Sequence, residues 1–201
     1  MFNKYDVYTT FGSKYCYKDS NVLRNKLNIK DYELLKQAET DIVSVKQNYL
    51  LSNPISGYFS MNHFCRIHEF LFCDIYNFAG HFRTETIKKG DTTFLNSTNI
   101  KPKMVNLLKK LRIENLLANM DYDEFVYKLT YYFAELNYYH PFREGNGRAT
   151  REFIRQLCEF NCYEIDWGKI DTIVLLDAMV ESVYNRNNLE HVIKICISKL
   201  K

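Results

Sequence analysis

The stretch HPFREGNGRATREF, residues 140–153, says the most about the fold and chemistry of this sequence. It follows a helical pattern that stops at Tyr139, and its first twelve positions contain one His, one Glu, one Asn, two Gly and three Arg. A hydrophobic core requires none of these side chains. A titratable base, a carboxylate, paired glycines and several guanidinium groups are together typical of a site that handles phosphate.

The glycines and arginines of this stretch predict an anion site at the start of a helix. Gly145 and Gly147 flank Asn146 where the next helix is expected to begin, so backbone N–H groups without helical partners should point outward. Arg148 and Arg151 are three positions apart and therefore share one face just beyond that site. Guanidinium groups bind two oxygens at once, which suits a polyphosphate.

Two further residues complete the predicted site. Glu144 directly precedes the glycines and can hold Mg²⁺, which prefers one or two carboxylates together with phosphate oxygens. His140 ends the preceding helix and can act as a base. A histidine near a helix end is often only a cap, and an arginine face is often only solvated. Six polar residues of these types in one turn and helix are much harder to explain in that way.

Hydrophobic periodicity predicts a mainly helical chain, since only 7 Gly and 3 Pro interrupt it. Leu34, Leu35, Ala38, Ile42 and Val45 are expected to form the core face of the helix that starts at Asp31. Four helices are predicted from their starts, at Asp19 or Ser20 for a short one, at Asp31, at Ser97 or Thr98, and at Asp121, and the helix from Asp31 is expected to end at 52. The helix from Ser97 or Thr98 carries Pro102 in its first turn. The other predicted helices are 60–76, 146–160 with Phe153, Leu157 and Phe160 inward, 171–184 and 189–200.

The bulk properties favour one globular domain, residues 1–201, with a core at about 60–200 and an N-terminal extension at about 1–59. The formal charge of +3 is too small for a typical nucleic-acid binder. Neither a signal segment nor a run of about 20 apolar residues is present, so neither secretion by a leader nor a membrane span is expected. The six cysteines lack a C-x-x-C pair and favour a reducing cytoplasm. A zinc site built from His63, Cys65, His68 and Cys73 is conceivable, although its spacing fits no standard ligand pattern.

HPFREGNGR resembles the signature of the Fic family, H-P-F-x-[DE]-G-N-[GK]-R, at every position. YKDSNVLRNKLNI (17–29), FAGHFRT (78–84) and a predicted hairpin at about 85–94 also resemble parts of Fic domains, in the same order and spacing. The resemblance covers nearly the whole chain. It implies an all-α, Fic-type fold with a β-hairpin flap over the active site.

The resemblance also implies an activity, which is the transfer of AMP from ATP to a Tyr, Ser or Thr hydroxyl of a protein with release of pyrophosphate. His140 matches the base and Glu144 matches the Mg²⁺ ligand. Gly147, where other members have Lys, favours AMP transfer over an inverted-nucleotide kinase. The remaining matches concern ATP phosphates: Gly145, Asn146 and Gly147 form the anion hole, Arg148 contacts the β-phosphate and Arg151 the γ-phosphate.

The family also suggests how partners bind. Its flap adds a strand to a segment of the target protein, and Lys88, Lys89 and Phe94 are the candidate target contacts here. Many members carry an inhibitory helix, [ST]-x-x-x-E-[GN]. No Glu of this chain has Ser or Thr four residues earlier, and the look-alikes at Ser20 and Ser182 place Arg24 and Arg186 at the Glu position. The chain therefore resembles the bacterial toxin branch, whose inhibitor is a separate small antitoxin with a Ser-x-x-x-Glu-Gly-like helix.

Several alternatives stay open at this point. A Fic fold can transfer UMP or phosphocholine in place of AMP, or serve as a scaffold without activity, although an intact motif argues against the scaffold. Toxin relatives suggest DNA gyrase or topoisomerase IV subunits as the target, and secreted relatives suggest host GTPases. The sequence does not choose among these.

Overall fold

A computed structural model describes residues 12–89 and 92–200 of the chain. The helices of this part alternate with short loops, and two small antiparallel sheets accompany them. The helices are α1 (Tyr32–Ser52), α2 (Met61–Phe72), α3 (Ser97–Ile113), α4 (Tyr122–Tyr139), α5 (Asn146–Phe160), α6 (Thr172–Glu181) and α7 (Asn187–Cys196). The strands are β1 (Lys88–Lys89), β2 (Thr92–Thr93), β3 (Tyr163–Ile165) and β4 (Ile197–Lys199). The predicted mainly helical fold with a hairpin is confirmed.

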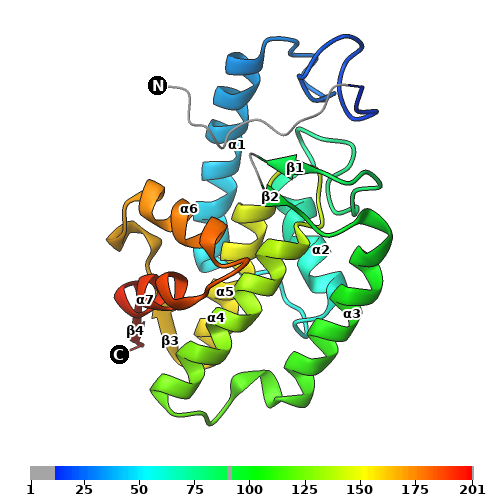
Figure 1. Ribbon diagram of the computed structural model, residues 1–201. Coiled ribbons are helices and arrows are strands. Elements are labelled where there is room, and N and C mark those ends of the chain that lie inside the picture. The colour runs from blue at the N-terminus through cyan, green and yellow to red at the C-terminus, as the bar shows by residue number, and fades with distance from the viewer. Residues whose placement is uncertain (1–11, 90–91, 201) are drawn as a thin grey trace.

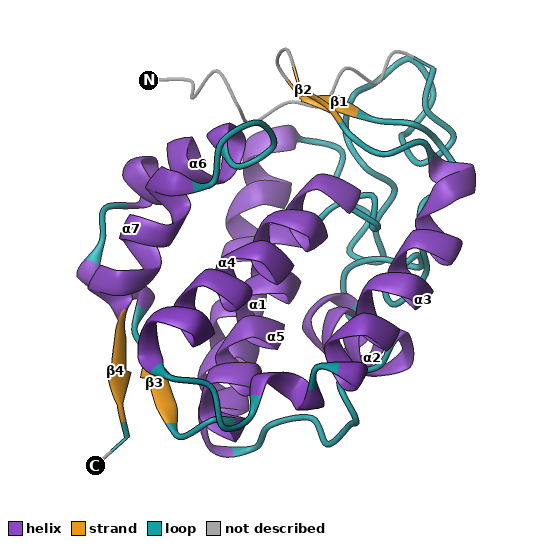
Figure 2. Ribbon diagram, turned by 60° about the horizontal axis from the view of Figure 1, so that its bottom comes forward, coloured by secondary structure: helices purple, strands orange, loops and turns teal. Residues whose placement is uncertain are grey.

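α4 and α5 lie in the middle of the molecule, with α2 and α3 on one side and α6 and α7 on the other (Figures 1 and 2). One hydrophobic cluster runs through these helices and includes residues from Cys16 to Ile197. Its central members come from α4 and α5, where Phe133 and Phe153 have no exposed surface. The loop that joins these two central helices is the predicted site, so the core of the protein fixes it on both sides.

Four predicted helix starts agree with the structure and carry a short polar side chain as the cap. Asp31, Ser60, Asp121 and Asp171 each accept a hydrogen bond from a backbone N–H of the first turn. Such caps satisfy N–H groups that have no partner inside the helix. α5 begins at Asn146, as predicted.

Three local predictions are wrong. No helix starts at Asp19 or Ser20; turns and a single bridge between Cys16 and Leu23 occupy this segment. The core face of α1 consists of Leu35, Glu39, Val43 and Leu50, whereas Leu34 and Val45 are 64% and 69% exposed. Phe160 is 54% exposed. The two apolar faces of α1 lie side by side, and periodicity alone does not tell which one is buried.

The second sheet was not predicted. α7 ends at Cys196, and the next three residues form β4, which pairs with β3 so that Tyr163 lies opposite Lys199 and Ile165 opposite Ile197. The apolar residues of 189–200 recur at helical spacing through the end of α7 into β4, which explains why the sequence suggested one long helix. The pairing ties the end of the chain to the segment that follows α5 (Figure 2).

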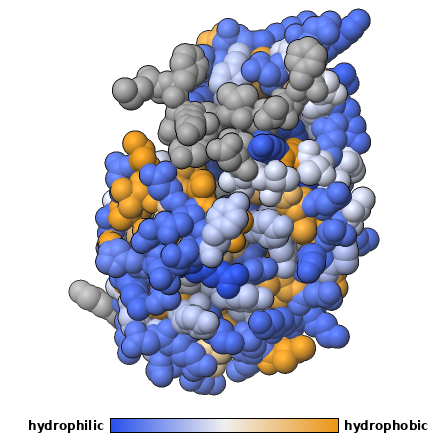
Figure 3. Space-filling view, viewed as in Figure 1, coloured by the Kyte–Doolittle hydropathy of each residue, from blue (hydrophilic) through white to orange (hydrophobic). Residues whose placement is uncertain are grey.

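The surface in Figure 3 is mostly hydrophilic, and a group of apolar side chains lies over α6, whose Ile173 and Val174 are exposed. Among the described residues, no helix combines the length and the apolar character that a bilayer crossing demands.

Candidate active site

The candidate site is built on the short connection between α4 and α5, residues 140–145. His140 closes α4 by donating its backbone N–H to the Leu136 carbonyl at 3.2 Å. It does so with φ 43° and ψ 58°, a left-handed conformation that is uncommon outside glycine but tolerated by His, Asn and Asp. This turn directs the chain from the end of one central helix to the start of the other.

The imidazole of His140 is buried and oriented by two contacts. Nδ1 lies 3.1 Å from the Asn137 carbonyl oxygen. Because a carbonyl only accepts, Nδ1 carries the hydrogen, and the neutral ring then has its lone pair on Nε2. Phe94 stacks on the ring with a centroid distance of 3.8 Å. The ring is therefore held in the tautomer that a base needs.

The electrostatic surroundings keep His140 neutral. Burial lowers its pKa to about 3, the nearby charges of Lys89 and Arg83 add to this effect, and the hydrogen bond to Asn137 opposes it. At neutral pH the imidazole is therefore unprotonated and able to accept a proton.

Arg83 braces this loop, although no sequence pattern assigned it a role. It is only 2% exposed, and its Nε donates to the His140 carbonyl at 2.8 Å. Its Nη1 donates to the carbonyl of Glu85, and its Nη2 donates to that of Leu95. The last two residues stand at the two ends of the flap, so one guanidinium joins the flap to the histidine loop. Its position within FAGHFRT was the available signal.

Asn146 closes the loop from the other side. Its side-chain Oδ1 accepts from the Phe142 N–H and its Nδ2 donates to the Phe142 carbonyl, both at 2.8 Å. Both polar atoms of the amide thus take part in shaping the loop, each through one hydrogen bond to Phe142. Phe142 is fully buried and stacks on His68 at 3.7 Å.

His68 of α2 holds the loop through both of its ring nitrogens. Its Nδ1 accepts from the Gly80 N–H at 2.9 Å, so its Nε2 carries the hydrogen and donates to the Glu144 carbonyl at 2.9 Å. Burial lowers its pKa to about 3 and keeps it neutral. No group of His, Cys, Asp and Glu in residues 12–89 and 92–200 has the arrangement of a metal site, which includes the zinc site considered above.

The start of α5 has the features of an anion site. Gly145 stands at the cap position with φ 78°, and no described side chain caps the helix. A Cβ at Gly145 would lie 2.3 Å from the ring of Phe72, so only glycine fits. A Cβ at Gly147 would lie 3.3 Å from the Arg151 guanidinium. The first-turn N–H groups of α5 are therefore open to a ligand that the two glycines let approach.

Three charged side chains surround this helix start. Glu144 is partly buried and accepts from the Gly145 N–H at 2.9 Å through Oε1. Arg148 lies over the Phe72 ring, and its Nη2 is 3.5 Å from Glu144 Oε1. Arg151 has no acceptor among the described residues, and burial together with the charge of Arg148 lowers its pKa to about 10. A guanidinium without an anion beside an open helix start favours a phosphate ligand.

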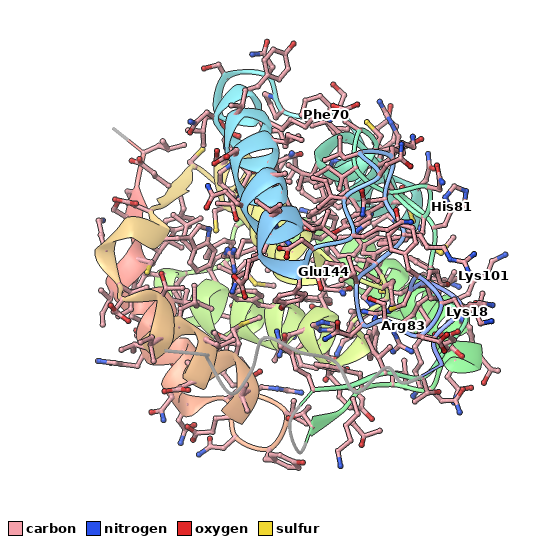
Figure 4. All side chains as sticks on the ribbon, turned by 90° about the horizontal axis from the view of Figure 1, so that it is seen from above. Lys18, Phe70, His81, Arg83, Lys101 and Glu144 are labelled. Atoms are coloured by element: carbon pink, nitrogen blue, oxygen red, sulfur yellow. The ribbon has the colours of Figure 1, made fainter. Side chains whose placement is uncertain are left out.

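Glu39 of α1 belongs to the site and was missed. Its Oε1 lies 2.6 Å from Arg148 Nη2, and Tyr76 donates its hydroxyl hydrogen to the other oxygen. The available signal was a carboxylate on the helix face that Leu35, Val43 and Leu50 bury. Figure 4 shows Glu144 beside this helix.

The flap separates two cavities. One of about 200 Å³ is bordered by Glu39, Glu144 and Arg148, and the other, of about 60 Å³, by His140 and Phe94. Lys89 of β1 borders both. The hairpin pairs Lys88 with Thr93 and Lys89 with Thr92, and its predicted turn at Gly90 and Asp91 lies outside the described residues.

The predicted target contacts differ in position. Lys88 is exposed and Lys89 is half-buried, so both stay candidates for contact with a target. Phe94 is 7% exposed and packs against Ile87 and His140, so its side chain supports the base and is not presented to a target.

Comparison with known proteins finds protein adenylyltransferases among the relatives of this chain. Protein adenylyltransferase VbhT of Bartonella schoenbuchensis is 36% identical over 182 residues, which are 90% of this chain but only 38% of that protein. The probable protein adenylyltransferase Fic of Salmonella typhimurium is 33% identical over 156 residues, 78% of this chain and 77% of that protein.

The fold has close structural neighbours. A crystal structure of BepC from Bartonella tribocorum with bound AMPPNP has a TM-score of 0.85 and 25% identity, covering 93% of this chain and 97% of that one. The Fic/DOC family model matches residues 58–158, which run from α2 to α5 and include the histidine loop, the anion site and the flap. This chain therefore belongs to the Fic/DOC family.

Proposed function

We propose that this chain is a protein adenylyltransferase, a nucleotidyltransferase that moves AMP from ATP to a Tyr, Ser or Thr hydroxyl of another protein. The observation that carries the proposal is the pairing, within one short loop, of a neutral buried histidine with an open helix start. The adenylyltransferase names of the relatives and the AMPPNP in the BepC structure support the choice of ATP.

The reaction requires a base on one side of the α-phosphorus and a stabilised leaving group on the other. The target hydroxyl gives its proton to His140 Nε2, its oxygen forms a bond to the α-phosphorus, and the bond from that phosphorus to the bridging oxygen breaks. Pyrophosphate leaves with the electron pair. Arg148 and Arg151 stabilise its charge, and the first-turn N–H groups of α5 hold the phosphates in line.

Glu144 suits a magnesium ion at this place. Both contacts of its carboxylate use Oε1, so Oε2 is available as a ligand, and the open helix start beside it would bring phosphate oxygens. Mg²⁺ prefers one or two carboxylates together with phosphate oxygens. When bound, the ion would neutralise charge that develops on the departing phosphates.

Labelled nucleotides test the proposal directly. The purified chain is incubated with a bacterial lysate, Mg²⁺ and one α-labelled nucleoside triphosphate at a time. We expect protein labelling from ATP, and labelling from none of the other three. Labelling from UTP alone would replace AMP with UMP transfer, and a labelled phosphocholine donor covers the remaining transferase alternative. A chain that binds ADP but labels no protein with any donor would favour the scaffold.

Arg151 offers a prediction about which phosphate it binds. Arg151→Ala is expected to weaken ATP binding by about 1.5–3 kcal/mol and to leave AMP binding nearly unchanged, because the proposed partner is the γ-phosphate. The fold should be unaffected, since Arg151 has no anion among the described residues to leave unpaired.

Calorimetry with ATP and AMP measures the difference. Arg155→Ala is the matched control one helical turn later, because Arg155 is occupied by Glu152, Glu159 and the Leu50 carbonyl. It should change both affinities alike. An equal loss of both nucleotides in Arg151→Ala would remove Arg151 from the γ-phosphate role.

The partners follow from the same proposal. A target segment would pair with the flap near Lys88 and Lys89, as an added strand. Gyrase or topoisomerase IV subunits are the candidate targets in a bacterial cytoplasm, and a host GTPase is the candidate if the protein is secreted. All six cysteines are free, which fits a reducing compartment. A separate antitoxin would present a Glu to Arg151, the guanidinium for which the described residues provide no anion.

A further inference from the structure

α1 lies outside the stretch that the family model matches, yet it supplies a carboxylate to the site. Glu39 is 8% exposed and stands on the buried face of the helix, between Leu35 and Val43. A buried carboxylate on an otherwise apolar face is costly unless it is paired. The groups that pair with Glu39 therefore decide what this carboxylate does at the site.

Both oxygens of Glu39 are held. Oε1 pairs with Arg148 Nη2 at 2.6 Å, and Oε2 accepts from the Tyr76 hydroxyl. The Tyr76 ring stacks on Phe78 with a centroid distance of 4.6 Å, which fixes the direction of that hydroxyl. Burial and the nearby Glu144 raise the pKa of Glu39, and Arg148 opposes them. The carboxylate is thus rigid, and its charge depends on Arg148.

Arg148 lies between two carboxylates. Its Nη2 is 2.6 Å from Glu39 but 3.5 Å from Glu144, which is four residues earlier on the same segment. Glu and Arg four residues apart form an ion pair readily. Without the charge of Glu39, the nearest acidic partner for the largely buried Arg148 would be Glu144. An ion pair between Arg148 and Glu144 would then occupy both the guanidinium that is proposed to bind phosphate and the carboxylate that is proposed to bind the metal.

The location of the ion pair argues against a purely structural role. Glu39, Arg148 and Glu144 all border the cavity of about 200 Å³, so the pair forms the wall of a ligand-sized space. Both carboxylate contacts of Arg148 use Nη2. Its Nη1 and Nε remain donors for a phosphate, so Glu39 orients the guanidinium without using all of it.

We propose that Glu39 is a positioning residue that prevents Arg148 from moving from its 3.5 Å contact into a close ion pair with Glu144, so that Arg148 stays available to the phosphates of the nucleotide and Glu144 to the metal. This inference rests on the proposed nucleotide site. It adds α1, outside the matched stretch, to the parts of the chain that prepare the site.

The test uses ADP binding in the absence of Mg²⁺, which requires neither transfer nor the metal. Glu39→Gln keeps the shape of the side chain and removes the charge. It is expected to weaken ADP binding about 10–100-fold, by analogy with the loss of a residue that orients a metal ligand. Glu33→Gln, at an exposed position of the same helix, is the matched control and should bind as the wild type does.

A double variant tests whether Glu144 competes with the phosphates for Arg148. In a Glu144→Gln background the described residues include no second carboxylate in contact with Arg148, so adding Glu39→Gln should change ADP affinity by no more than about twofold. A loss as large as in the wild-type background would show that Glu39 serves the fold alone and overturn the proposal. Tighter ADP binding in the single variant would make Glu39 a competitor of the phosphate, which also overturns it.

A second variant keeps the test decisive if Glu39→Gln does not fold. Tyr76→Phe removes only the hydroxyl that holds Oε2, and it should weaken ADP binding in the same direction by a smaller factor. Unchanged binding in a folded Tyr76→Phe would contradict the proposal. The proposed function is judged separately, because a chain that fails to label any protein can still show, through ADP affinity, whether Glu39 positions Arg148.

Discussion

Replacing His140 with Asn is expected to lower the rate of AMP transfer by about 10²–10⁴-fold while ADP still binds. The imidazole is the only group of the loop that is neutral, buried and oriented with a lone pair on Nε2, among the residues that the structure describes. Asn is preferred to Ala because His140 has φ 43°, and Asn tolerates the left-handed conformation. The loss should therefore reflect the missing base and not a disturbed turn.

The measurements are label transfer in a lysate, thermal unfolding and ADP calorimetry. Transfer at the wild-type rate by a folded variant would exclude His140 as the base.

The pH dependence of AMP transfer by the wild type gives a second test of the buried imidazole. Since burial lowers the pKa of His140 to about 3, the base stays unprotonated as the pH falls through 6.5. The rate should consequently show no loss centred near pH 6.5, where an exposed histidine would titrate.

Gly145→Ala is expected to destabilise the protein by about 2–5 kcal/mol and to abolish nucleotide binding. Two independent costs add up: about 1–2 kcal/mol for a Cβ in the left-handed region and about 1–3 kcal/mol for overpacking. The second arises because the new methyl group would lie 2.3 Å from the Phe72 ring, which itself supports Arg148. The start of α5 would have to shift, and the anion site with it.

Urea unfolding and ADP calorimetry measure the two effects. Gly12→Ala is the matched control, because Gly12 has φ 81° but no described atom within 4 Å of the place that a Cβ would take. It isolates the conformational cost, so the difference between the two variants gives the cost of the clash. Equal destabilisation of the two variants, with ADP binding retained in Gly145→Ala, would contradict the close packing of Gly145 on Phe72.

The sequence predicted the helical elements well where polar caps and one apolar face coincide, as at Ser60 and Asp121. It failed where the choice depends on tertiary packing. In α1, Leu34 and Leu35 are equally apolar, and only the neighbours in space decide that Leu35 is the buried one. β4 exists because β3 lies beside it, and strand pairing between distant segments leaves little trace in a local pattern.

The motif residues were predicted because they share one contiguous stretch, whereas their supports lie far along the chain. Arg83 and Glu39 reach the site from positions that are 57 and 109 residues away from their partners. Phe94 was predicted as a candidate target contact because it belongs to the flap. Its burial against His140 arises from the fold of the flap over the loop, which no pattern in the sequence encodes.

The bonds of Arg83 have a consequence for how such an enzyme can diversify. One guanidinium connects both ends of the flap to the carbonyl of His140. The segment proposed to bind the target and the proposed base are therefore held in place by the same side chain. Lys88, an exposed residue of the flap, can change without the loss of any of these three hydrogen bonds. Target preference can therefore change through substitutions at such exposed positions, whereas a substitution of Arg83 would disturb the flap and the base together.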